Sequence, residues 1–160
     1  MKTRDTPTLR PLKVEDAIIS VSWRNNPIIW EKTINSPTRF ITIKEENAWI
    51  KKVIADKKSY RFAIEVKSVY IGNVQLTNIE NDESYFGIFL GDTNYWGRGI
   101  AKQATKIILD YGFNILKLKK IKLRVRSNHT VAHNMYLKLG FQEVDRNVDV
   151  IFMDIEKFQE

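Results

Sequence analysis

The chain has 160 residues, of which 43% are hydrophobic and 28% are charged, as is usual for a soluble globular protein large enough to bury a core. It contains no cysteine and only two histidines, which excludes disulfides, thiolate metal sites and a cysteine nucleophile, and we expect no metal site. An excess of Lys and Arg over Asp and Glu, 26 against 19, gives a net charge of +7 and favours an anionic partner such as a nucleotide cofactor, a nucleic acid or an acidic membrane.

The N-terminal region is polar and shows no signal peptide, and no run approaches the roughly 18 apolar residues of a membrane span. We therefore expect a cytoplasmic protein that is not bound to a membrane. No repeat, low-complexity tract or Gly/Ser/Pro-rich linker divides the chain, so residues 1–160 are predicted to form a single domain.

The first third of the chain contains short elements. Leu9 to Leu12 is predicted as an opening strand and residues 14–23 as a helix, and Pro27 forces a break before a second short helix. Thr42 and Glu45 have the spacing of a capping box, which predicts the start of a third helix.

The middle of the chain changes to the alternation of a β-sheet. Residues 60–66 and 69–76 are predicted to form a hairpin that turns at Lys67–Ser68. Residues 84–90 are an aromatic-rich third strand, and Gly87 within it indicates a bulge or a close backbone approach.

The last third alternates helices and strands. Residues 99–116 have the clearest apolar stripe at helical spacing, and residues 121–126 alternate as a half-buried strand does. A shorter helix over 131–139 and strands over 141–144 and 148–155 complete the chain. This order predicts an α/β (α+β) fold in which helices cover a mixed sheet.

The junction between the strand 84–90 and the helix that follows is the most informative segment. A helix N-terminus presents unpaired N–H groups and a partial positive charge, and Gly97 and Gly99 lack the Cβ atoms that would keep an anion away. Three cations lie on the same first turns: Arg98, Lys102 and Lys106. The segment therefore fits a diphosphate. The alternative interpretation is a helix start whose glycines only permit a tight turn.

Two other phosphate-binding loops do not fit this junction. A dinucleotide-binding fingerprint would need a third glycine at position 102, which is lysine. A Walker loop that begins at Gly91 would need glycine at position 96, which is tryptophan.

A second segment with chemical potential runs from Asn128 to Phe141. Ala132, Tyr136 and Leu139 fall on one face of its predicted helix. On these residues alone, Tyr136 is a core aromatic whose hydroxyl reaches an edge, and Asn128 is a loop or cap residue.

Together these segments resemble the GNAT superfamily of acyl-CoA-dependent N-acetyltransferases. The resemblance rests on the strand Tyr85-Phe86-Gly87-Ile88-Phe89-Leu90, the turn Tyr95-Trp96-Gly97-Arg98-Gly99-Ile100-Ala101 and the Asn…Ala…Tyr…Gly-Phe segment. In the family's pyrophosphate motif, Gln/Arg-x-x-Gly-x-Gly/Ala, Gly99 and Ala101 match while Trp96 replaces the leading polar residue. The resemblance covers nearly the whole chain and implies a mostly antiparallel, twisted sheet flanked by helices.

The resemblance implies that acetyl-CoA is the cofactor. The residues it assigns to acetyl-CoA are Ile88, Phe89, Leu90, Trp96, Gly97, Arg98, Gly99, Ile100, Ala101, Lys102 and Asn128. The role of Asn128 stays open, because it stands four residues before Ala132, whereas the family's usual spacing is three. We expect a bulge near Phe86–Phe89 to expose backbone N–H groups that polarise the thioester, and the main chain of Ile88 and Leu90 to pair with the pantetheine amides.

The resemblance also implies direct attack of a primary amine on the thioester. By family position, Tyr136 is the candidate acid for the leaving thiolate. Glu83 is the candidate base, acting through water, and Glu65 is a weaker one; each is equally well explained as a solvated carboxylate.

The acceptor is expected to be a small-molecule amine. Trp23, Arg24 and Asn25 are predicted on the acceptor side, since residues 23–27 resemble members that acetylate nucleotide-linked amino sugars, and the opening segment resembles the Rim-type branch. A polyamine and a protein N-terminus are the alternatives. A homodimer is a further expectation, because dimers are common in related families.

Two other classes of function compete with an enzyme. A basic run could track the phosphates of a nucleic acid, although no RNA-binding signature accompanies it. Its members are Lys117, Lys119, Lys120, Lys122, Arg124 and Arg126. The other class is an inactive regulatory domain that binds CoA. Nucleic acid is the less favoured partner.

Overall fold

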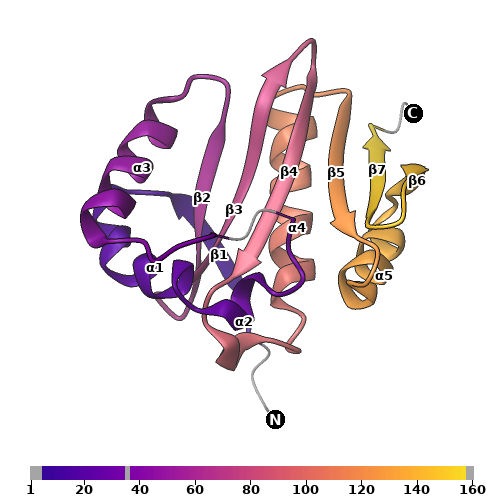
Figure 1. Ribbon diagram of the computed structural model, residues 1–160. Helices are drawn as coiled ribbons and strands as arrows, with labels where there is room; N and C mark the ends of the chain where they lie inside the picture. Colours follow the sequence, from indigo (N-terminus) through magenta and orange to yellow (C-terminus); the bar gives the residue numbers. More distant parts are fainter. Residues whose placement is uncertain (1–4, 35–36, 158–160) are drawn as a thin grey trace.

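A seven-stranded sheet with the strand order β1-β2-β3-β4-β5-β7-β6 forms the centre of the protein (Figure 1). The computed structural model describes residues 5–34 and 37–157. The strands are Pro7–Pro11 (β1), Tyr60–Val66 (β2), Val69–Glu80 (β3), Glu83–Leu90 (β4), Lys120–Arg126 (β5), Gln142–Arg146 (β6) and Val150–Glu156 (β7). Only β4 and β5 pair in parallel among these neighbours, which confirms the expected mixed, mostly antiparallel sheet.

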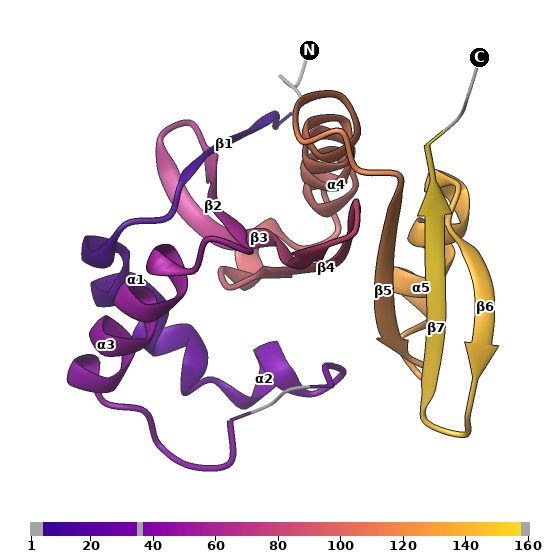
Figure 2. The same ribbon diagram turned by 90° about the horizontal axis from the view of Figure 1, so that it is seen from above.

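Helices cover both faces of this sheet. They are Ala17–Arg24 (α1), Pro27–Trp30 (α2), Ile43–Ala55 (α3), Ile100–Asp110 (α4) and Thr130–Leu139 (α5). Seen from above, α4 lies on one face of strands β2 to β4 and α2 lies on the opposite face (Figure 2). Within residues 5–34 and 37–157, no helix is long and apolar enough to cross a membrane.

Two local structures predicted from the sequence, a helix cap and a hairpin turn, form as expected. Thr42 Oγ1 accepts from the Glu45 N–H at 3.2 Å and Glu45 Oε2 accepts from the Thr42 N–H at 2.8 Å, so the capping box starts α3. Lys67 and Ser68 both have positive φ, 51° and 67°, as a two-residue hairpin turn between β2 and β3 requires.

The helix predicted over residues 99–116 forms over residues 100–115, but it changes from α to π geometry near its end. α4 ends at Asp110, and Tyr111–Ile115 forms one π-helical turn. Gly112 lies inside this turn, and an added Cβ there would come within 3.0 Å of Ile121 and Leu76. The wider turn thus brings the backbone close to the sheet, which periodicity alone does not predict.

The strands β4 and β5 separate after a short contact, and this divergence positions the candidate site. Their parallel pairing covers only Glu83–Tyr85 with Lys120–Lys122. Figure 1 shows the two strands side by side at the upper end and apart at the lower end. The expected bulge near Phe86–Phe89 is wrong, because the β3–β4 register is unbroken from Tyr85 to Leu90. The open edge of β4 arises from the loss of its neighbour.

Two hydrophobic clusters pack against the sheet. The larger one joins α4 and α5 to the strands, with Ile108, Leu123 and Tyr136 among its buried members. The smaller one lies under α1 and α3 and contains Trp23 and Ile50. Burial of this apolar area on both faces holds the diverging strands in place.

Gly91, directly after β4, is predicted to tolerate no side chain. An added Cβ would lie 1.9 Å from the Trp23 ring, and this ring is held by Tyr70 and Phe89 at centroid distances of 4.7 Å and 6.0 Å. We expect Gly91→Ala to lower the free energy of unfolding by about 1–3 kcal/mol in urea denaturation, as overpacking does. Gly87→Ala is the matched control, because its Cβ would meet the flexible end of Gln75 at 2.5 Å. Equal losses in both variants would contradict this account.

Candidate functional site

The turn between β4 and α4 has the backbone conformation of an anion cradle. Gly97 and Gly99 have φ of 73° and 75°, which L-residues with side chains rarely adopt. Gly99 is the N-cap of α4, and apart from adjacent residues and the α4 backbone, no atom of the described residues lies within 4 Å of a Cβ added at either glycine. Open space therefore lies in front of the first N–H groups of the helix, where a diphosphate would bind.

The predicted side chains of this turn divide into two groups. Ile100 is buried in the core, so only its main chain can serve a ligand, whereas Ala101 and Lys102 are half-buried on the first turn. Trp96 is 44% exposed and donates its Nε1–H to the Leu90 carbonyl at 2.9 Å. Trp96 thus ties the turn to the end of β4, and this explains how an indole replaces a polar residue there.

Arg98 has a partner that the sequence did not predict. Its Nη1 lies 3.1 Å from Asp5 Oδ2, and its guanidinium lies 5.3 Å from the Tyr95 ring centroid. The Gln103 side chain donates to the Asp5 carbonyl at 3.2 Å, so residue 5 is held at the first turns of α4. Arg98 is 52% exposed and remains free to turn toward an anion.

The open edge of β4 presents the main chain of Ile88 and Leu90. The Gly91 N–H donates to the Ile71 carbonyl at 2.8 Å, and hydrogen-bonded pairs alternate along an antiparallel ladder. The N–H and C=O groups of Ile88 and the N–H of Leu90 therefore point away from β3, toward the space that β5 has left, while the Leu90 carbonyl accepts from Trp96. An extended chain of amides can pair with them as an added strand would.

Phe89 does not join this edge. Its main chain is directed toward β3, and its ring packs against Trp23 and Trp30 at centroid distances of 6.0 Å and 5.1 Å. The structure therefore places the Phe89 side chain with the aromatic cluster on the α1–α2 face.

Tyr136 on α5 lies beside the open edge of β4. Its ring is 7% exposed and packs edge-on against Phe86 and Phe141, with centroids 5.8 Å and 5.7 Å away. No side chain or carbonyl of the described residues hydrogen-bonds its hydroxyl. Burial raises the pKa of the Tyr136 hydroxyl, which keeps it protonated and able to donate at neutral pH.

The two candidate bases lie away from Tyr136. Glu83 is 37% exposed where β4 and β5 still pair, 3.8 Å from the Lys120 ammonium, and alternation places it on the opposite face of β4 from Phe86. Glu65 on β2 forms an ion pair with Arg10, which also binds Asp16. The structure does not bring either carboxylate together with Tyr136.

Asn128 lies in the loop between β5 and α5. It is exposed, and α5 begins two residues later, at Thr130. No side-chain hydrogen bond of Asn128 is formed within the described residues, so its amide is available to a ligand.

A cavity of about 530 Å³ opens on the α1–α2 face, opposite α4. Its lining includes Arg24, Asn25, Trp30 and Glu31 from α1 and α2, and Arg126 from the end of β5. Two of the three predicted acceptor-side residues therefore reach a cavity. Trp23, the third, is 7% exposed in the core beneath it.

Arg24 is fixed at this cavity by partners distant in the sequence. Its Nε lies 3.2 Å from Glu46 Oε2, and its guanidinium stacks 4.1 Å from the Trp49 ring centroid. Glu46 is 1% exposed, and burial raises the pKa of its carboxyl even though Arg24 opposes this shift. Asn25 is also fixed, because its amide pairs with both backbone groups of Ile41 at 2.8 Å.

Trp30, Glu31 and Arg126 are lining residues that the sequence analysis did not assign to the acceptor side. The sequence pattern could have indicated Arg126, since it ends a strand whose alternate residues are all cationic and so share one face. No sequence pattern indicated Trp30 and Glu31, because a four-residue helix is too short to show a periodicity from which its buried face can be predicted.

This arrangement suits a transfer between two ligands that meet at the divergence of β4 and β5. A phosphorylated ligand can place its anion at the Gly97–Gly99 turn and an amide chain along Ile88 and Leu90. Its reactive end would then lie near Phe86 and the Tyr136 hydroxyl. A second ligand can enter from the cavity on the opposite face.

Comparisons with known proteins agree with this chemistry. The family model described as "Acetyltransferase (GNAT) domain" matches residues 8–142. The spermidine N(1)-acetyltransferase of Escherichia coli K12 is 31% identical over 143 residues, which are 88% of this chain and 75% of that protein. The structure of spermidine N-acetyltransferase from Vibrio cholerae in complex with CoA and spermine has a TM-score of 0.85 and 29% identity, and the alignment covers 94% of this chain and 95% of that one. A dodecameric structure of the same Vibrio enzyme in an intermediate state has a TM-score of 0.79 and 28% identity, covering 94% and 93% of the two chains.

Proposed function

The chain belongs to the acetyltransferase (GNAT) domain family and is an acetyl-CoA-dependent N-acetyltransferase, and from this premise we propose that it acetylates a primary amine of a small molecule bound in the α1–α2 cavity. The observation that carries the proposal is the divergence of β4 from β5. It leaves the main chain of Ile88 and Leu90 open between the glycine turn on one face and the cavity on the other.

The donor site is built from main chain more than from side chains. We assign the pyrophosphate to the N–H groups of residues 97–102, with Arg98 and Lys102 as auxiliary charges. Trp96 orders the turn through the Leu90 carbonyl, and the Ile88 main chain and the Leu90 N–H pair with the pantetheine amides. Asn128 lies in the loop before α5 with an exposed side chain, and we assign it to the pantetheine arm. Phe89 contributes through the aromatic cluster and not through contact with the cofactor.

The chain's own residues supply two functions to the reaction. The N–H groups on the open edge of β4 polarise the thioester carbonyl as the amine attacks the carbonyl carbon. The Tyr136 hydroxyl donates its proton to the sulfur as the carbon–sulfur bond breaks. Acetyl-CoA supplies an acyl group activated as a thioester. Glu83 remains the proposed base and would have to act through water, given its place on the other face of β4.

The acceptor class has two candidates that an observation supports. The substrates named for the relatives favour a polyamine over the nucleotide-linked amino sugar that residues 23–27 suggested. In this chain's own cavity, Arg24 and Arg39 are paired with Glu46 and Glu45. The described lining charges without an ion pair are therefore Arg126 and Glu31, which suit an acceptor that carries an anion beside its amine. A protein N-terminus of the Rim type is a third alternative with no such support.

Two further features belong to the proposal. We assign residues 1–160 to one domain, because both hydrophobic clusters pack on one sheet. We also propose that copies of the chain associate, as the relative from Vibrio cholerae does.

Acetyl-CoA turnover with a panel of amines tests the proposed function. We expect CoA release, followed with a thiol reagent, to depend on an added primary amine and to yield its N-acetyl product by mass spectrometry. Spermidine, glucosamine and an α-amino peptide represent the acceptor classes. Binding of acetyl-CoA by calorimetry without turnover of any amine would instead support an inactive regulatory domain.

A further inference from the structure

The cations of β5 lie on the acceptor face of the sheet. Leu123 and Val125 are buried in the core with α4 and α5, and side chains alternate along a strand. Lys122, Arg124 and Arg126 therefore face the other side, where α1 and α2 lie, and Arg126 lines the cavity. This is the second half of the basic run noted in the sequence.

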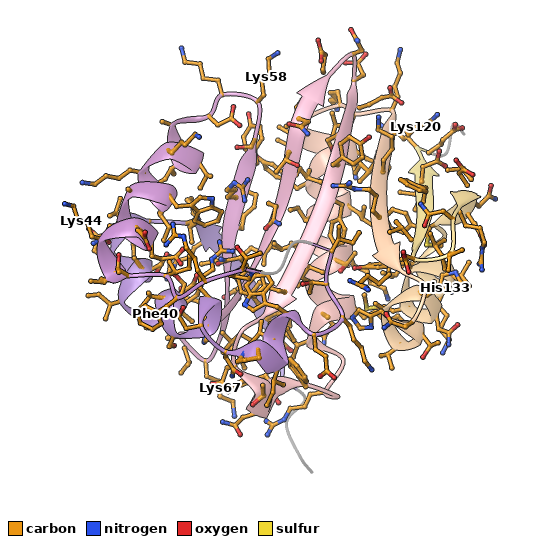
Figure 3. The ribbon with its side chains drawn as sticks, in the orientation of Figure 1. Phe40, Lys44, Lys58, Lys67, Lys120 and His133 are labelled. Atoms are coloured by element: carbon orange, nitrogen blue, oxygen red, sulfur yellow. The ribbon has the colours of Figure 1, made fainter. Side chains whose placement is uncertain are left out.

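The first cation of the strand is neutralised. The Lys120 ammonium lies 3.8 Å from Glu83, 3.9 Å from Asp154 and 3.5 Å from Glu156. Figure 3 labels Lys120 near the upper end of β5, where β4 and β5 still pair. It labels Phe40, which lines the cavity, lower down on the left of the molecule. The carboxylates therefore compensate the end of β5 that is remote from the cavity.

The last two cations have no such partners. Arg124 faces Phe152 across the β7 ladder and Arg126 faces Val150, and β4 has already separated on their other side. Within residues 5–34 and 37–157 neither arginine forms an ion pair. The Arg126 Nη1 donates to the Thr33 carbonyl at 3.4 Å, and its buried Nε has no acceptor in the described part of the chain.

The other cations of the cavity are paired. Arg24 binds Glu46 at 3.2 Å, and Arg39 binds Glu45 at 2.7 Å. Of the charged lining residues that the structure describes, Glu31 and Arg126 are the two without an ion pair. The cavity thus presents one free carboxylate and one free guanidinium, with Arg124 two residues beyond.

We infer that Arg126, assisted by Arg124, binds a phosphate or carboxylate group of the acceptor, so that the substrate is an amine that also carries an anion. A guanidinium can offer two parallel N–H donors to either group, and Arg126 lines the cavity without an ion pair that would occupy its charge in the described residues. Two uncompensated cations would repel a polyamine, whereas Glu31 can attract the single ammonium of an anionic amine. This inference rests on the proposed function and selects between its two acceptor candidates.

Matched pairs of amines test the inference on the full-length protein saturated with CoA, so that phosphate cannot bind at the donor turn. Glucosamine against glucosamine 6-phosphate isolates a phosphate, and putrescine against 4-aminobutyrate exchanges an ammonium for a carboxylate at similar chain length. Calorimetry gives the affinity of each, and turnover with acetyl-CoA gives kcat/KM. We expect the anionic member of at least one pair to bind about 10-fold tighter or more. The pair that shows the difference tells phosphate from carboxylate.

Variants locate the effect at β5. Arg126→Gln is expected to remove the preference for the anionic amine. Arg124→Gln, at an exposed position, is expected to reduce that preference about threefold. Lys119→Gln is the control for net charge, because Lys119 is 78% exposed and pairs with Asp82 at the remote end. Equal affinity within both pairs, a preference for putrescine, or an unchanged preference in Arg126→Gln would overturn the inference. Turnover of no amine at all would instead overturn the proposed function.

Discussion

Tyr136→Phe is expected to lower kcat about 100-fold while the KM for acetyl-CoA changes less than about threefold, as the loss of one general acid does. The variant removes one oxygen atom and keeps the ring that packs against Phe86 and Phe141. Because no described residue hydrogen-bonds the hydroxyl, its removal leaves no protein partner unsatisfied. Steady-state turnover by thiol release measures the effect.

The pH profile distinguishes this acid from other groups. Burial raises the pKa of Tyr136 above its ordinary value near 10, so the wild-type acid stays protonated from pH 6 to 9, and its own titration does not limit the rate there. Tyr136→Phe should therefore lower kcat by a constant factor across this range. Phe141→Leu, which alters the packing around the ring but keeps the hydroxyl, is the comparison for a purely structural effect. A loss in Phe141→Leu as large as that in Tyr136→Phe would argue against a proton donor.

Elements governed by neighbouring residues were predictable from the sequence. The capping box at Thr42 and the hairpin turn at Lys67–Ser68 depend on contacts within a few residues, and both formed as predicted. The glycine turn is of the same kind, because positive φ at Gly97 and Gly99 and the helix that follows are encoded locally.

Features that depend on distant partners were not predictable. Arg24 is held by Glu46, which is 22 residues away, and Arg98 by Asp5, which is 93 residues away. The opening of the β4 edge was attributed to a bulge, whereas it follows from the short pairing with β5, a strand 30 residues further along the chain. Periodicity reports which face of an element is buried but not which element covers it, so the acceptor cavity could not be assembled from the sequence.

Gly99→Val is expected to raise the KM for acetyl-CoA more than about 10-fold. The left-handed conformation at Gly99, φ 75° and ψ 10°, costs a β-branched residue about 1–3 kcal/mol. A Cβ at this position would enter the space at the start of α4, which no described residue other than the adjacent ones and the α4 backbone occupies within 4 Å. Calorimetry with CoA and thermal unfolding separate the loss of affinity from the loss of stability.

Gly99→Asn is the matched variant that separates the effect of backbone strain from the steric effect of a side chain in front of the turn. Asparagine adopts the left-handed region several-fold more readily than valine does, so Gly99→Asn should recover most of the stability lost in Gly99→Val. It still carries a Cβ, so its affinity for CoA should remain low if the space before the turn holds the pyrophosphate. S-acetylpantetheine, which lacks the diphosphate, should be used equally well by the wild type and Gly99→Asn. If Gly99→Asn bound CoA as tightly as the wild type does, the diphosphate would have to lie elsewhere than at this turn.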